Sequence, residues 1–182
     1  MNLETKLQQI KLVICDVDGV LTDGLLHYDA QGEAIKSFHV RDGLGIKMLM
    51  DAGIQVAILS GRDSAVLRKR IDDLKIPLFF LGKLEKESAC FELMRLAGVQ
   101  PEQTAYIGDD SVDLPAFAVC GLSFAVADAA DYVQSQADYV LKLGGGRGAV
   151  REMSDMILKA QGKDAVYRSA QGFLHSVTNM GQ

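Results

Sequence analysis

Carboxylate side chains gather in two short stretches of the sequence, each directly after an apolar run. In the first, Asp16 and Asp18 are two positions apart, so in extended backbone they lie on the same face. The second stretch, 108–113, reads Gly-Asp-Asp-Ser-Val-Asp and contains Asp109, Asp110 and Asp113. If the two stretches meet, their carboxylates repel one another unless a cation lies between them. Mg²⁺ prefers carboxylate oxygens and takes its remaining ligands from water and phosphate, so we expect a Mg²⁺ site.

A hydroxyl and a cation follow two further apolar runs. Ser60 precedes a glycine, and a small hydroxyl beside exposed backbone N–H groups is suited to holding a phosphate. Lys83 and Lys86 follow the next run, and either could supply positive charge for a phosphoryl oxygen. Taken singly, each of these residues is also explained as a helix N-cap, a turn residue or a solvated charge. Five carboxylates at the ends of two strands are harder to explain in that way.

The apolar runs that carry these residues alternate with segments of helical period. Near-continuous apolar strands, each followed by a helix, are typical of a parallel sheet with helices on both faces. The sequence therefore predicts an α/β fold with a doubly wound, Rossmann-like parallel sheet that binds ligands at the carboxyl ends of its strands. The predicted strands are 11–17, 55–59, 77–81 and 104–107, with weaker candidates at 122–126 and 138–143, and the predicted helices are 43–51, 64–74, 85–97, 113–119, 129–136 and 148–161.

One segment, at about 25–40, breaks the alternation. Two short strand-like runs flank a turn rich in Asp, Gln and Gly, which predicts a β-hairpin inserted after the first strand. We find no repeat or linker, so we expect one domain over 1–182, ending in a tail at about 163–182. Glycines follow four predicted helices, where we expect left-handed C-caps at Gly53, Gly98, Gly121 and Gly162.

The composition argues against several classes of protein. The formal net charge is -5 and 48% of the residues are hydrophobic, which favours a folded protein and disfavours nucleic-acid binding, since that depends on Lys and Arg. No stretch has the length and apolarity of a membrane span, and the first ten residues are too polar for a signal peptide. Cys15, Cys90 and Cys120 lack the paired spacing of thiolate metal sites, so we expect reduced core cysteines and a cytoplasmic protein.

Taken in order, four of these features resemble the signature of the haloacid dehalogenase superfamily. They are Asp16-x-Asp18, then Ser60, then Lys86, then Gly108-Asp109-Asp110-x-x-Asp113. The resemblance implies that Asp16 is the nucleophile, which forms an aspartyl-phosphate, and that Asp18 is the general acid and base. It also implies that Asp16, the backbone carbonyl of Asp18, and Asp109 hold Mg²⁺, while Ser60 and Lys86 hold the phosphate. Asp110 and Asp113 would orient Lys86 or metal-bound water.

Longer motifs give a closer resemblance. The segments 16–24, 38–47, 58–62 and 145–152 together look like those of the 3-deoxy-D-manno-octulosonate 8-phosphate phosphatase family. This implies hydrolysis of that sugar-acid phosphate, in the pathway to the lipopolysaccharide inner core, by a homotetramer whose neighbouring subunits complete each active site. The spaces between the motifs leave no room for a separate cap domain. The substrate contacts carried over are Asp18, His39, Val40, Arg41, Asp42, Gly43, Ser60, Gly61, Arg62, Arg70 and Lys86.

Other interpretations stay open. A phosphatase for a related nine-carbon sugar-acid phosphate would carry the same motifs. A receiver-type signalling domain also combines aspartates, Mg²⁺ and a lysine, but its acceptor ends a middle strand, whereas the acidic pair here follows the first. A non-catalytic assembly module would keep the hairpin without needing all the carboxylates. For Arg70, a solvated helix charge is nearly as good an explanation. The tail, with Phe173, Leu174 and Val177 at helical spacing, could cover a neighbour's site or fray.

Overall fold

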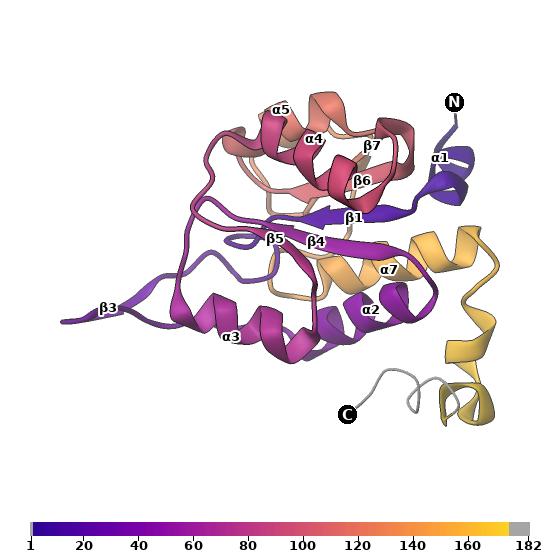
Figure 1. Cartoon of the computed structure of the whole chain (residues 1–182), viewed down its shortest axis with the longest axis horizontal. Helices are drawn as coiled ribbons and strands as arrows, with labels where there is room; N and C mark the ends of the chain where they lie inside the picture. The colour runs from indigo at the N-terminus through magenta and orange to yellow at the C-terminus, as the bar shows by residue number, and fades with distance from the viewer. Residues whose placement is uncertain (1, 175–182) are drawn as a thin grey trace.

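A six-stranded parallel sheet forms the centre of the computed structural model, which describes residues 2–174 (Figure 1). Its order is β5-β4-β1-β6-β7-β8, and every pairing is parallel. β1 therefore lies between β4 and β6, and the predicted doubly wound α/β fold is confirmed. The strands are β1 Leu12–Cys15, β4 Gln55–Leu59, β5 Leu78–Phe80, β6 Thr104–Gly108, β7 Leu122–Ala125 and β8 Tyr139–Val140.

Helices cover both faces of this sheet. On one face lie α4 and α5, and on the other lie α2, α3 and α7 (Figure 1). Because both faces are covered, β1, β6 and β7 are buried along their whole length. The helices are α1 Leu3–Gln9, α2 Val40–Asp51, α3 Ala65–Leu74, α4 Lys86–Ala97, α5 Leu114–Val119, α6 Asp131–Gln134 and α7 Ala149–Ala160, and the short 3₁₀ turns are η1 Pro101–Gln103, η2 Ser111–Asp113 and η3 Ala165–Arg168.

The pair α2 and α7 packs closely beneath the sheet. α7 buries Val150, Met153 and Ile157 on one face, at the spacing expected for a helix over a core. α2 presents Gly45 at the crossing, where an added Cβ would lie 2.9 Å from Oγ of Ser154. The two backbones can approach only because this position has no side chain.

The turn that follows β1 is packed closely against two other loops, at two glycines. Gly19 has a φ of +88°, and a Cβ there would lie 2.0 Å from Oδ2 of Asp109. Gly145 packs against the same turn, since its Cβ would lie 1.8 Å from the carbonyl oxygen of Gly19. Gly146 also donates its N–H to the carbonyl of Val20 at 2.9 Å. The turn carrying the first acidic pair is therefore clamped by the loop that precedes α7.

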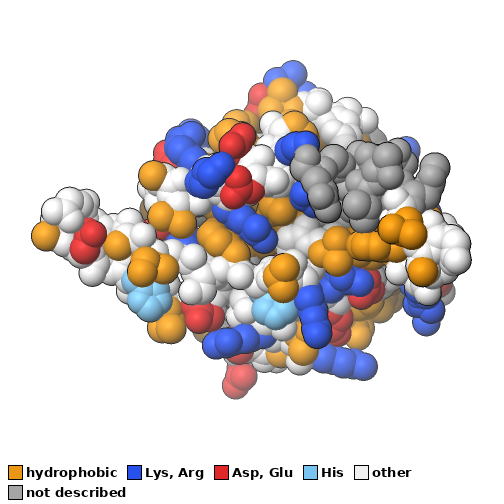
Figure 2. Space-filling model, turned by 90° about the horizontal axis from the view of Figure 1, so that it is seen from below, with side chains coloured by type: hydrophobic (Ala, Val, Ile, Leu, Met, Phe, Trp, Pro, Cys, Tyr) orange, Lys and Arg blue, Asp and Glu red, His pale blue; other side chains and the backbone are white. Residues whose placement is uncertain are grey.

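The predicted hairpin is present and stands clear of the body of the molecule (Figures 1 and 2). Its antiparallel strands are β2 His27–Asp29 and β3 Gly32–Ile35. Figure 2 shows hydrophobic side chains along it, and the most exposed of these include Leu25 and Tyr28 at 60% and Ile35 at 58%. The hairpin follows β1, so it projects from the carboxyl edge of the sheet.

Most predicted elements agree with the structure to within a few residues, and the differences have local causes. The second strand of the hairpin already ends at Ile35, and α2 begins at Val40, three residues before the predicted start at 43. The last strand shrinks from 138–143 to two residues, because the N–H groups of Lys142 and Leu143 bond to Glu152 instead of continuing the ladder. α1 was not predicted. Val177, one of the three tail residues at helical spacing, lies outside the described residues.

The predicted left-handed C-caps are present at three of the four glycines that follow predicted helices. Gly53, Gly98 and Gly162 have positive φ angles, as expected. Gly121 does not, and the prediction of a left-handed cap there is wrong. A Cβ at Gly121 would lie 2.6 Å from Cα of Glu102, so close packing against η1 accounts for the glycine. Among the described residues, no helix is both long and apolar enough to cross a membrane.

The clamp on the β1 turn predicts an unequal effect of two alanine substitutions. Gly145→Ala should lower the free energy of unfolding by about 3 kcal/mol, because the methyl group meets a backbone oxygen that cannot rotate away. Gly53→Ala is the control: nothing lies within 4 Å of its Cβ, so only the left-handed backbone opposes it, at about 1–2 kcal/mol. Equilibrium urea unfolding measures both, and equal losses would contradict the clamp.

Candidate active site

The two acidic stretches meet at the carboxyl edge of the sheet. β1 and β6 are neighbours in the sheet, with Cys15 beside Ile107, so the residues that follow these strands come together. One carboxylate oxygen each from Asp16, Asp109 and Asp113 lies within 4.8 Å of the others. The expected convergence of the carboxylates is therefore present in the fold.

Lys86 lies between two of these carboxylates. It is the first residue of α4, and its side chain is only 1% exposed. Its ammonium group donates to Oδ1 of Asp16 at 2.7 Å and to Oδ1 of Asp113 at 2.6 Å. Lys83, the other sequence candidate, is exposed and donates its backbone N–H to the carbonyl of Ser60. Of the two lysines that the sequence offered, the structure thus places Lys86 beside Asp16 and Asp113.

Asp113 is the most completely bonded carboxylate of the group. Besides Lys86, its Oδ1 accepts the hydroxyl of Tyr106 at 2.7 Å. Its Oδ2 accepts the backbone N–H groups of Asp109 and Asp110, at 2.9 and 3.2 Å. These contacts occupy both oxygens, so Asp113 orients Lys86 and the loop after β6. Asp110 instead accepts from Ser111 and from the hydroxyl of Tyr132.

The electrostatics of the site suit a divalent cation. Burial, together with the charges of Asp16 and Asp113, raises the pKa of Asp109 to about 8. Burial also raises the pKa of Asp16, with a contribution from Asp113, while Lys86 lowers it. The pKa of Lys86 is raised: burial alone would lower it, but Asp16 and Asp113 outweigh that effect. Since one ammonium cannot neutralise three carboxylates, Asp16 and Asp109 form a fitting oxygen pair for a hard cation.

Asp18 lies on the same turn but makes different contacts. Its Oδ1 accepts from the ammonium of Lys36, and its Oδ2 lies 3.7 Å from Nε of Arg62. Lys36 and Arg62 both contact Glu33 as well, at 3.2 and 3.3 Å. Sequence reasoning missed Lys36 and Glu33, because residues three apart in an extended strand point to opposite faces. No spacing rule would have paired them with Asp18.

The predicted phosphate-binding turn follows β4. Ser60 is buried, and its Oγ accepts the N–H of Arg62 at 3.1 Å. Gly61 packs beneath the loop after β5, where a Cβ would lie 2.8 Å from Leu84. Arg62 also bonds to the hydroxyl of Tyr28 on the hairpin. Ser60, Gly61 and Arg62 thus lie on the same edge of the sheet as Asp16 and Asp18.

The remaining predicted contacts form a second group, at the start of α2. His39 is the N-cap residue, and Val40 is 80% exposed. Asp42 is buried, which raises its pKa, and it accepts the N–H of Arg151 at 2.8 Å. Arg70 reaches this group from α3, with its guanidinium 5.4 Å from the ring of Phe38. A Cβ on Gly43 would lie 2.4 Å from Arg70, so these two residues must fit together.

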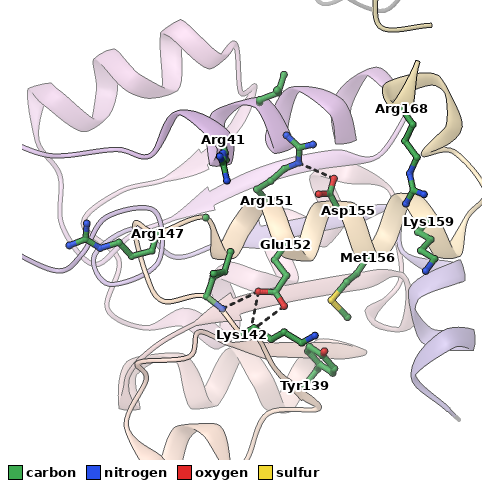
Figure 3. A pocket seen from close by; sticks show the side chains of 13 residues that line it. Arg41, Tyr139, Lys142, Arg147, Arg151, Glu152, Asp155, Met156, Lys159 and Arg168 are labelled. Atoms are coloured by element: carbon green, nitrogen blue, oxygen red, sulfur yellow. Dashed lines mark hydrogen bonds and ion pairs between the residues drawn. The ribbon is translucent and has the colours of Figure 1, made fainter. Parts of the chain in front are cut away.

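Arg41 faces a separate cavity of about 760 Å³ (Figure 3). The cavity lies along α7 and contains none of the five aspartates of the acidic stretches. Within the cavity lining, Arg151 forms an ion pair with Asp155 at 2.9 Å. Glu152 accepts the backbone N–H of Lys142, which belongs to the same lining. The charged side chains that line the cavity are mostly basic. They are Arg41, Lys142, Arg147, Arg151, Lys159 and Arg168, with the acidic Glu152 and Asp155.

Comparisons with known proteins agree on one family. The model of the haloacid dehalogenase-like hydrolases matches residues 79–153. Over 180 residues the chain is 74% identical to the 3-deoxy-D-manno-octulosonate 8-phosphate phosphatase of Haemophilus influenzae, covering 99% of this chain and 100% of that protein. The corresponding phosphatase of Yersinia pestis is 50% identical over 154 residues, covering 85% of this chain and 82% of that protein.

Solved structures give the same result. The cobalt-bound phosphatase of Haemophilus influenzae has a TM-score of 0.91 and 76% identity, covering 93% of this chain and 99% of that one. A 3-deoxy-D-manno-octulosonate 8-phosphate phosphatase from Moraxella catarrhalis, in complex with magnesium, phosphate and KDO, has a TM-score of 0.87 and 38% identity. That match covers 91% of this chain and 95% of the other.

The geometry predicts that Asp109 and Asp110 differ in their effect on the response of the melting temperature to Mg²⁺. Mg²⁺ should raise the melting temperature of the wild type and of Asp110→Asn, whose carboxylate contacts Ser111 and Tyr132, but not that of Asp109→Asn. Without metal and above pH 8, Asp109→Asn should melt higher than the wild type. The raised pKa of Asp109 means that its ionisation opposes folding as the pH rises to about 8.

Thermal unfolding with Mg²⁺ and with a chelator measures these shifts. A Mg²⁺ response that survives in Asp109→Asn would contradict the assignment of the metal ligands.

Proposed function

The chain belongs to the 3-deoxy-D-manno-octulosonate 8-phosphate phosphatase family of haloacid dehalogenase-like hydrolases, and we propose that it hydrolyses this phosphate to the free sugar acid and inorganic phosphate. The observation that carries the proposal is the group formed by the buried Asp16 and Lys86 and the half-buried Asp109 at the carboxyl edge of the sheet. The chain also aligns with 100% of its Haemophilus influenzae relative. The reaction would serve the synthesis of the lipopolysaccharide inner core.

In the proposed first step, a carboxylate oxygen of Asp16 attacks the phosphorus of the substrate. The bond to the C8 oxygen of the sugar breaks as the aspartyl-phosphate forms, and Asp18 gives a proton to the departing oxygen. In the second step, water attacks the phosphorus and Asp18 takes its proton. Inorganic phosphate leaves, and the Asp16 carboxylate is restored.

The charges around Asp16 support this sequence. A carboxylate is repelled by the phosphoryl oxygens unless cations neutralise them. Lys86 provides one such charge at a position fixed by Asp113. Mg²⁺, held by Asp16, Asp109 and the backbone carbonyl of Asp18, supplies further positive charge when bound. Ser60 and its turn hold the phosphate opposite Lys86.

We propose that the working form is a homotetramer. The exposed apolar side chains of the hairpin, on an otherwise acidic chain, support association through this element. The division of the predicted substrate contacts supports it too, because the group at the start of α2 and Arg70 could complete the site of a neighbouring subunit. The substrate would then be enclosed between subunits, and no cap domain is needed.

We also propose that the protein acts in the cytoplasm as one domain. Cys15, Cys90 and Cys120 are free thiols and all are buried, which suits a reducing compartment. A single cluster of buried side chains runs from α1 to α7, and this supports one folding unit.

Phosphate release tests the proposed activity. The wild type with Mg²⁺ should release phosphate from 3-deoxy-D-manno-octulosonate 8-phosphate with a higher kcat/KM than from a nine-carbon sugar-acid phosphate. Asp16→Asn should lower kcat by at least about 10³-fold, because the amide cannot act as the nucleophile. Asp110→Asn serves as the control and should stay active, because the Asp110 carboxylate bonds to Ser111 and Tyr132. Preference for the nine-carbon substrate would favour the alternative, and an active Asp16→Asn would overturn the nucleophile.

The hairpin yields a prediction about assembly. Leu25→Glu combined with Leu26→Glu should convert the tetramer to smaller species, since buried carboxylates would be placed in the contact. Leu96→Glu changes a similarly exposed leucine on α4 and should leave the tetramer intact. Size-exclusion chromatography with light scattering measures the mass of each form. A tetramer that survives the hairpin changes would contradict this assembly.

A further inference from the structure

We propose that Lys36 is a positioning residue for Asp18, carried to the active site by the hairpin. This inference rests on the proposed function, in which Asp18 protonates the departing sugar oxygen. Lys36 follows β3 directly, so the hairpin and the acid group are joined by one side chain.

The burial of Lys36 is the first observation. Its side chain is 1% exposed, although the preceding residue, Ile35, is 58% exposed. A buried ammonium is costly unless carboxylates pair with it. Lys36 has two such partners, Asp18 and Glu33. The chain therefore turns this lysine inward, out of the hairpin surface, to meet the acidic turn.

The contacts of Asp18 are the second observation. Lys36 bonds to Oδ1, and Arg62 lies 3.7 Å from Oδ2, so cations from two different elements hold the two oxygens. Asp16, two residues earlier in the chain, pairs instead with Lys86 on α4. Each of the two carboxylates thus has its own lysine, and the one that serves Asp18 comes from the hairpin.

Glu33 completes the arrangement. Its side chain is 7% exposed, and its Oε2 contacts both Lys36 and Arg62. The pKa of Glu33 is lowered: burial would raise it, but hydrogen bonds from Ser64 and Lys36 outweigh that effect. An ionised Glu33 fixes the two cations relative to one another. The direction of the Asp18 carboxyl group is then set by the position of the hairpin.

This role differs from phosphate binding in a way that kinetics can detect. Protonation of the leaving oxygen matters for a sugar alkoxide, which is a poor leaving group, and much less for p-nitrophenolate. For both substrates, kcat/KM reports only the steps up to transfer of the phosphoryl group to Asp16. A lysine that acts through Asp18 should therefore affect the sugar phosphate selectively.

The test compares kcat/KM of Lys36→Met for the sugar-acid phosphate and for p-nitrophenyl phosphate. We expect a loss of about 10²-fold with the sugar phosphate, typical of a displaced catalytic group, and less than about 5-fold with the aryl phosphate. Lys36→Arg should recover part of the loss, and Glu33→Gln should show a smaller loss of the same kind. Lys11→Met, at an exposed lysine on the far edge, is the matched control and should leave both values unchanged.

A double variant separates positioning from direct action. Adding Lys36→Met to Asp18→Asn should cause no further loss with the sugar phosphate, because Lys36 acts through Asp18. Equal losses on the two substrates, or full additivity in the double variant, would overturn the inference and favour phosphate binding or a purely structural role. If the wild type releases phosphate from the aryl substrate but not from the sugar-acid phosphate, the proposed function fails instead.

Discussion

One ammonium group, that of Lys86, holds the acidic edge of the sheet together. Its partners stand after β1 and after β6, and the lysine itself begins α4, so three separate elements meet at a single charge. Breaking such a buried contact by removing one member typically costs about 3–5 kcal/mol, because the remaining charge has no compensation. The neighbouring, parallel placement of β1 and β6 is what lets both carboxylates reach it.

Around Lys86, the negative charges of the carboxylates outnumber the positive charge of the ammonium group. Asp109 brings a third carboxylate to a place where one lysine already serves two, and Gly19 leaves it room to pack against the turn. The protein thus keeps a deficit of positive charge where a cation and a phosphoryl group can fill it. Folding stability and readiness for the ligand are opposed here, since the carboxylates destabilise the metal-free fold.

Much of the fold and part of the site could be predicted from the sequence. Strong apolar runs located the sheet, and the motifs located Asp16, Lys86 and Asp109. α1 was missed because Leu7 is its only buried residue, although the Asn2 side chain capping Thr5 was a possible signal. Contacts between distant segments could be predicted only where strand ends share an edge of the sheet, as for Asp16 and Asp109. Gly121, Arg41 and Lys36 owe their roles to neighbours that only the folded chain brings near them.

The two outer strands of the central sheet are also its shortest. β5 spans three residues and β8 only two, so neither edge offers another chain a long row of free N–H and C=O groups. Exposed strand edges are templates for aggregation, and short ones are a common protection. The short outer strands thereby protect the central sheet from uncontrolled edge-to-edge pairing with other chains.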